Sequence, residues 1–116
     1  MTNNDLKERT KKFAVRVLKL VDALPKTVSG GTLSKQIARS ATSVAANYRA
    51  ACRAKSKADF ISKLGTVEEE ADETLFWLEL AIEASLLPEP KLKLLMQEAE
   101  ELLKITVASI NTARKK

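Results

Sequence analysis

The chain of 116 residues is long enough to bury one core and too short for two, so we expect a single domain over residues 1–116. It has no histidine and one cysteine, which excludes the usual catalytic triads, imidazole metal sites and an internal disulfide. Only three glycines and three prolines interrupt a composition rich in Ala, Leu, Lys and Glu, and this favours helices throughout.

The formal net charge of +5 hides two halves of opposite sign. Residues 1–57 contain 13 Lys or Arg against 3 Asp or Glu, a net +10, and residues 58–116 contain 7 against 12, a net −5. A chain with one basic and one acidic half can bind a polyanion, or it can bind another copy of itself head to tail. Both interpretations are kept at this point.

Two amphipathic helices are predicted in the basic half, over residues 4–24 and 33–53. The first ends before Pro25, because a proline disfavours helical geometry in the residue before it. The segment PKTVSGGT then holds strong helix breakers, so we expect a loop there, with Thr32 as the N-cap of the second helix. Apolar stripes predict the buried faces: Leu6, Thr10, Phe13, Val17, Leu20, Val21 and Leu24 on the first helix, and Ile37, Ala41, Val44, Ala45, Tyr48, Ala51 and Cys52 on the second.

Two further helices are predicted in the acidic half, over residues 57–87 and 90–113. Ser56 and Asp59 fit a capping box before the third helix, and Pro88 ends it. The apolar stripes are Phe60, Leu64, Val67, Ala71, Leu75, Leu78 and Ile82, and then Leu92, Leu95, Met96, Ala99, Leu103, Val107 and Ile110. Four amphipathic helices with mostly short connections predict an all-α fold, an antiparallel up-down-up-down four-helix bundle.

Basic side chains gather on one arc of each of the first two helices, and no Asp or Glu occurs between Asp22 and Asp59. Such faces could hold the phosphates of RNA or DNA, and the lack of exposed aromatic residues nearby favours recognition of backbone or duplex shape over base stacking. The same charges could instead pair with the acidic third helix of a neighbouring subunit. The candidate phosphate contacts are Arg9, Lys12, Arg16, Lys19, Lys35, Arg39, Arg49 and Arg53.

Three large apolar residues, Phe76, Trp77 and Leu80, fall roughly opposite the apolar stripe of the third helix. A cluster of this kind on a solvent face is typical of an association surface, so we expect a homo-oligomer. The alternative is a bundle wide enough to bury both sides of this helix end. In the oligomer, the acidic partners of the basic helices would be Glu69, Asp72 and Glu73.

The run of carboxylates from Glu68 to Glu73 resembles the donors of a bundle di-iron site. Such sites also use Glu-x-x-His pairs, and no histidine is present, so we expect no metal, no cofactor and no catalysis. No run of about 18 apolar residues is long enough to span a membrane, and the polar start of the chain does not resemble a signal peptide. We therefore expect a cytoplasmic protein without a membrane partner.

Three runs, QIARSATSVAANYRAA, KSKADFISKL and EADETLFWLEL, resemble a family of four-helix bundle proteins encoded in intervening sequences of bacterial large-subunit ribosomal RNA genes. The chain is also similar to accessory variability proteins of diversity-generating retroelements. The matching positions are Arg39, Ser40, Asn47 and Arg49 in the second helix, and Ser56, Lys57, Asp59, Phe60, Glu73, Trp77 and Glu79 in the third. The chain departs from the common pattern at Ala46 and Tyr48 and in the acidic run Glu68 to Glu70.

This resemblance implies assembly into a ring of five subunits, and the retroelement relatives imply contact with nucleic acid and a reverse transcriptase. Our hypothesis from the sequence is a non-enzymatic homo-oligomer, a pentamer by resemblance, that binds structured RNA or DNA through the basic faces of its first two helices. The competing hypothesis is a protein-interaction scaffold without nucleic-acid binding, in which those basic residues pair with the acidic third helix of neighbouring subunits.

Overall fold

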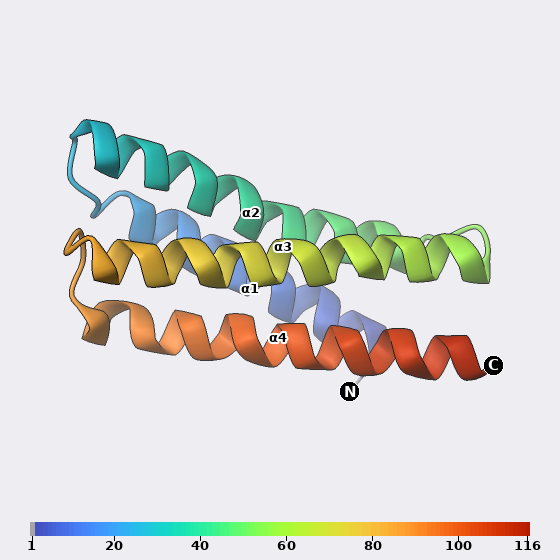
Figure 1. The fold of residues 1–116 in the computed structure, drawn as a ribbon. Coiled ribbons are helices and arrows are strands. Elements are labelled where there is room, and N and C mark those ends of the chain that lie inside the picture. The colour runs from blue at the N-terminus through green and yellow to red at the C-terminus, as the bar shows by residue number, and fades with distance from the viewer. Residues whose placement is uncertain (1) are drawn as a thin grey trace.

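Four antiparallel helices make up the part of the chain that the computed structural model describes, residues 2–116 (Figure 1). They are α1 (Asn3–Val21), α2 (Val28–Cys52), α3 (Lys57–Glu83) and α4 (Glu89–Lys115), and these residues form no strand. The predicted all-α fold and four-helix bundle are therefore confirmed.

Helices α2 and α3 form the centre of the bundle. Helix α1 packs against α2, and α4 packs against α3, whereas the contact between α1 and α4 is small. Helix α1 has 19 residues against 25 to 27 in the others, and in Figure 1 it runs obliquely behind α3. Because α2 lies between α1 and α3, only its outer face remains open to solvent.

Helix α2 begins at Val28, about five residues before the predicted start. Its N-cap is Thr27, whose Oγ1 accepts a hydrogen bond of 3.1 Å from the N–H of Gly30. The expected cap, Thr32, lies inside the helix and donates its hydroxyl to the carbonyl of Val28. The helix can begin here because Gly30 lacks a side chain: a Cβ on it would lie 1.9 Å from the carbonyl oxygen of Pro25. The predicted loop over PKTVSGGT was thus wrong in its second half.

Helix α3 ends at Glu83, four residues before the predicted end. Ser85 adopts a left-handed conformation with φ of 58°, and the N–H of Leu86 bonds back to the carbonyl of Ala81. This closing geometry satisfies carbonyls at the helix end and returns the buried Leu87 to the core.

The interior consists of two apolar clusters along the bundle. The cluster nearer the start of α2 contains Phe13, Val17, Leu24, Leu33, Ile37, Ala41, Leu78, Ala81, Leu87, Leu92, Leu95, Ala99 and Leu102. The other contains Leu6, Val44, Tyr48, Ala51, Leu64, Val67, Ala71 and Ile110. The predicted stripes supply most of these residues, but on α4 Val107 is exposed and Leu102 and Thr106 are buried.

Candidate nucleic-acid interface

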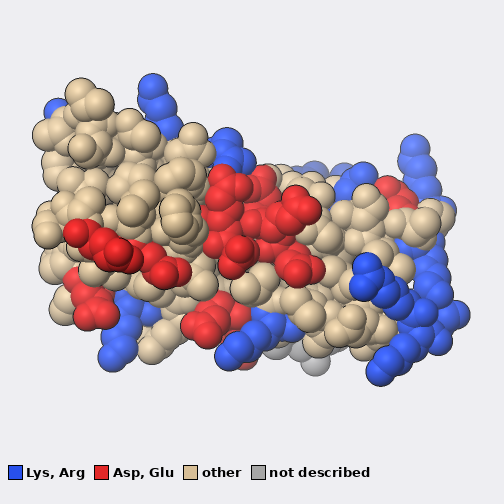
Figure 2. Space-filling view, in the orientation of Figure 1, with Lys and Arg blue, Asp and Glu red and all other residues tan. Residues whose placement is uncertain are grey.

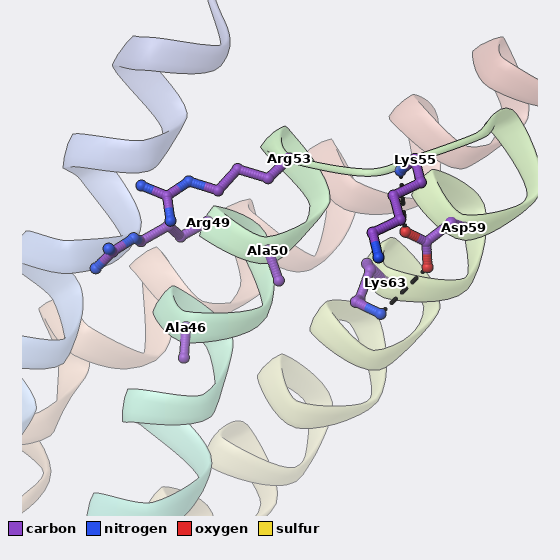
Figure 3. Close-up of a pocket in the computed structure, with 7 residues that line it drawn as sticks. All are labelled: Ala46, Arg49, Ala50, Arg53, Lys55, Asp59 and Lys63. Atoms are coloured by element: carbon purple, nitrogen blue, oxygen red, sulfur yellow. Dashed lines mark hydrogen bonds and ion pairs between the residues drawn. The ribbon is translucent and has the colours of Figure 1, made fainter.

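The C-terminal half of α2 presents two arginines above a surface of small side chains. Arg49 and Arg53 are exposed and lie one helical turn apart, with Ala46 and Ala50 beside them (Figure 3), whereas Tyr48 faces the core. We call these two arginines the Arg49–Arg53 ridge. It forms because the apolar stripe of α2 packs inward, which leaves the opposite side of the helix to carry charge.

A first groove lies between this ridge and the start of α3. It is lined by Ala46, Arg49, Ala50, Arg53, Lys55, Asp59 and Lys63. Asp59 is its one acid, and its carboxylate accepts from the backbone N–H of Lys55 and from Nζ of Lys63, each at 3.2 Å. The hydrogen bond from Lys55 and then that from Lys63 lower the pKa of Asp59. Four cations against one carboxylate leave this groove positive.

A second groove lies on the other side of the ridge, between α1 and α2. It is lined by Lys7, Glu8, Lys11, Ala45, Ala46, Arg49 and Arg53. In Figure 3 both arginines extend toward α1, away from the wall that carries Lys63. The ridge therefore separates two basic grooves and contributes charge to both.

The predicted phosphate contact Arg39 lies on the same helix, but its charge is already paired. Its guanidinium donates to both oxygens of Glu70, at 3.1 and 3.3 Å, and also to Glu73. The indole N–H of Trp77 donates to the same Glu73 carboxylate at 3.2 Å. The Trp77 hydrogen bond and then the Arg39 guanidinium hold the pKa of Glu73 below its usual value. These contacts join α2 to α3 within one chain.

Arg9 is also paired within the chain and lies on a different side of α1. Its Nε and Nη2 donate to the two oxygens of Glu98 on α4, at 2.8 and 2.7 Å. Lys12 and Arg16 line the same hollow between α1 and α4. The structure therefore does not gather the eight predicted phosphate contacts on one surface. Lys19 and Lys35 are exposed and line neither groove.

The predicted assembly residues are exposed to different degrees. Phe76 is 54% exposed and Leu80 is 36% exposed, whereas Trp77 is half-buried and packs against the chain's own core. The rings of Phe76 and Trp77 meet edge to face with centroids 5.0 Å apart. The expectation that all three lie opposite the core was thus wrong for Trp77, because the bundle covers part of its ring. Glu69 and Asp72 are exposed.

Charge is unevenly distributed along the long axis, which measures 47 Å. Figure 2 shows Asp and Glu gathered in the middle of the face nearest the viewer, and Lys and Arg toward the end where the C-terminus lies. The two basic grooves use residues from the end of α2, the start of α3 and the first turns of α1. They therefore belong to the basic end of the molecule.

Neither a metal centre nor a membrane span is found in the part of the chain that the structure describes. Between residues 2 and 116, no group of three or more His, Cys, Asp or Glu side chains is placed to hold a metal ion. Nor is any of the four helices both long and apolar enough to cross a bilayer.

The model of one protein family, the 23S rRNA-intervening sequence proteins, matches residues 2–108. The chain belongs to this family. A crystal structure of a protein with unknown function from the S23 ribosomal protein family, from Bacteroides thetaiotaomicron, is 36% identical to the chain. The match covers 96% of this chain and 99% of that one, with a TM-score of 0.86. No curated protein matches the chain significantly.

Membership of the 23S rRNA-intervening sequence family confirms the resemblance seen in the three sequence runs. It leaves the similarity to retroelement accessory proteins unconfirmed, so a reverse-transcriptase partner stays a prediction.

The site in this member of the 23S rRNA-intervening sequence family includes four lysines that were not predicted from the sequence: Lys7, Lys11, Lys55 and Lys63. Lys7 and Lys11 are four residues apart and so share one face of α1, which is the only local signal that could have indicated them. That this face borders Arg49 depends on how α1 crosses α2.

Proposed function

We propose that this member of the 23S rRNA-intervening sequence family is a non-enzymatic homo-oligomer that binds structured RNA or DNA through phosphates. The observation that carries the proposal is the Arg49–Arg53 ridge with a basic groove on either side. The ridge and the lysines of both groove walls supply six cations, against the acids Glu8 and Asp59.

The chemistry of these grooves suits a sugar-phosphate backbone. Alanines line both grooves beside the charged side chains, so a backbone can approach α2 closely between those side chains. No aromatic side chain lines either groove, so bases have no surface on which to stack. Cations that neutralise phosphates release counterions, and binding of this kind weakens as the salt concentration rises.

The predicted contacts divide into three groups in this proposal. Arg49 and Arg53 carry the main interaction, and the exposed Lys12, Arg16, Lys19 and Lys35 add to the surrounding positive field. Arg9 and Arg39 contribute least, because each would have to exchange a carboxylate of its own chain for a phosphate.

Self-association is the second part of the proposal. The exposed ring of Phe76 beside Leu80 offers an apolar contact, and the exposed Glu69 and Asp72 lie on the same helix. The resemblance to ring-forming proteins implies five copies.

A pure protein-interaction scaffold remains the alternative, since the exposed Phe76 fits that function equally well. It needs Arg49 or Arg53 to pair with acids of another subunit, because Glu73 already binds Arg39 of its own chain.

Binding of a labelled RNA hairpin and its DNA counterpart, followed by fluorescence anisotropy over a salt series, tests the proposed function. We expect affinity to fall steeply with salt for the unmodified protein. The double variant Arg49→Ala and Arg53→Ala should lower the slope of log K against log salt by about 2. Arg39→Ala removes a cation from the same helix face and is the matched control, with an expected slope close to that of the unmodified protein. Binding of neither hairpin would support the scaffold instead, and an equal effect of both variants would show that the Arg49–Arg53 ridge is not the main contact.

A further inference from the structure

We infer that the nucleic acid is an A-form RNA double helix that sits astride the Arg49–Arg53 ridge. The ridge would enter the minor groove, and the two phosphate strands would lie in the two basic grooves. This inference rests on the proposed function and names the ligand class of the same site.

The paired arrangement of the grooves is the first argument. One groove has Lys7 and Lys11 on its outer wall, and the other has Lys55 and Lys63, so cations lie on both sides of the arginines. A single strand would fill one groove and leave the lysines of the other without phosphates. Two strands held apart by a helical groove would engage both pairs.

The Lys63 ammonium remains available to a phosphate, although it contacts Asp59. An ammonium group has three donors, and the bond to Asp59 Oδ1 uses one of them. Because the backbone N–H of Lys55 also bonds to Asp59, that carboxylate holds the start of α3 in place. The Lys55 side chain is exposed and takes part in no ion pair within residues 2–116.

The low relief of the site is the second argument. Helix α2 packs against both α1 and α3, so a nucleic acid can reach only its outer face, which carries Arg49 and Arg53. The major groove of B-form DNA is about 8.5 Å deep and its minor groove about 6 Å wide, so a packed helix could not enter the first fully and is too broad for the second. The minor groove of A-form RNA is wide and shallow, and it presents 2′-hydroxyl groups to which arginines can donate.

The acids of α3 set the limit of the footprint. Glu70 and Glu73 lie beside Arg39, which precedes Arg49 by ten residues, or about 15 Å along the helix. Phosphates would be repelled there, and the duplex is therefore confined to the C-terminal half of α2. This half includes the end of the molecule at which Figure 2 shows the basic side chains.

Two variants of the full chain, each lacking one pair of lysines, distinguish binding of a duplex from binding of a single strand. One is Lys7→Gln with Lys11→Gln, and the other is Lys55→Gln with Lys63→Gln. Lys91→Gln with Lys93→Gln removes two exposed charges from α4 and is the matched control. The probes are a blunt 20-base-pair RNA duplex, a DNA duplex of the same sequence and one strand of the RNA alone.

Each groove variant should lower the salt slope for the RNA duplex by about 2, and the control should leave it unchanged. The single strand should respond to one of the two pairs only, and the DNA duplex should bind at least tenfold more weakly than the RNA duplex. Thermal melting followed by circular dichroism verifies that each variant is folded. Lys55→Arg with Lys63→Arg should bind like the unmodified protein because it keeps both charges.

The inference is overturned while the proposed function survives if only one lysine pair affects RNA duplex binding, or if the DNA duplex binds as tightly as the RNA duplex. Absence of salt-dependent binding to all three probes would instead overturn the proposed function itself.

Discussion

The hydroxyl of Thr74 on α3 donates a hydrogen bond of 2.8 Å to the hydroxyl of Ser40 on α2, and both side chains are completely buried. Ser40 also donates to the carbonyl of Ile37, at 3.3 Å, and Thr74 lies within 2.7 Å of the carbonyl of Glu70. Each hydroxyl therefore has a backbone carbonyl as a second hydrogen-bond partner. This contact is a place where a small side chain lets α2 and α3 approach closely.

Size at position 40 should matter more for stability than the hydrogen bond does. We expect Ser40→Ala to change the free energy of unfolding by less than about 1 kcal/mol, because Thr74 keeps the Glu70 carbonyl as an acceptor. Ser40→Leu should cost about 1–3 kcal/mol, because the site has no room for a larger side chain. Urea unfolding followed by circular dichroism measures both. Equal stability of the two variants would show that the helices are not in close contact here.

Glycines in the helices should respond to alanine in opposite ways. A Cβ at Gly30 would meet the Pro25 carbonyl oxygen, so we expect Gly30→Ala to lower stability by about 1–3 kcal/mol. A Cβ at Gly31 or Gly65 would have no atom within 4 Å, so Gly31→Ala and Gly65→Ala should each raise stability by about 0.5–1 kcal/mol. Thermal melting of the three variants gives the comparison. A stabilising Gly30→Ala would contradict the observed start of α2.

Glu73 should titrate below the usual range of a glutamate, and its contribution to stability should depend on pH. Because its folded pKa is lowered, that contribution is present above the unfolded pKa, near 4.5, and is lost as the pH falls through the folded value. Trp77→Phe should raise the Glu73 pKa by removing the largest cause of the shift, and Arg39→Ala should also raise it. Carbon-13 NMR of the Glu73 carboxylate between pH 2 and 7 measures each value. A carboxylate in either variant that titrates as in the unmodified protein would rule out that contact.

Assembly is best tested at Phe76, because Trp77 is partly in the core of its own subunit. We expect light scattering to give an oligomer for the unmodified protein and a folded monomer for Phe76→Glu, since a charge would disrupt an apolar contact. Leu94→Glu, at a residue 66% exposed on α4, is the matched control and should keep the oligomer. An unmodified protein of monomer mass, or an unchanged mass of the Phe76 variant, would exclude this contact.

The number of helices and most of their buried faces could be predicted from the order of the residues alone. Phe13, Ile37 and Leu78 each belong to an apolar stripe with helical spacing on their own helix, and all three are completely buried. The cap at Ser56 was also predictable, because its Oγ accepts from the N–H of Asp59 three residues later in the same turn. These features depend on geometry within one or two turns, and neighbouring residues in the sequence fix that geometry.

Which charged side chains face one another depends instead on how the four helices pack together. Arg39 and Arg49 look alike in sequence, yet Arg39 meets Glu70 of α3 and Arg49 borders two basic grooves. The start of α2 could likewise not be predicted from the sequence, because it requires Gly30 to fit against Pro25. In each case the outcome depends on where one segment crosses another, and helical periodicity carries no information about that crossing.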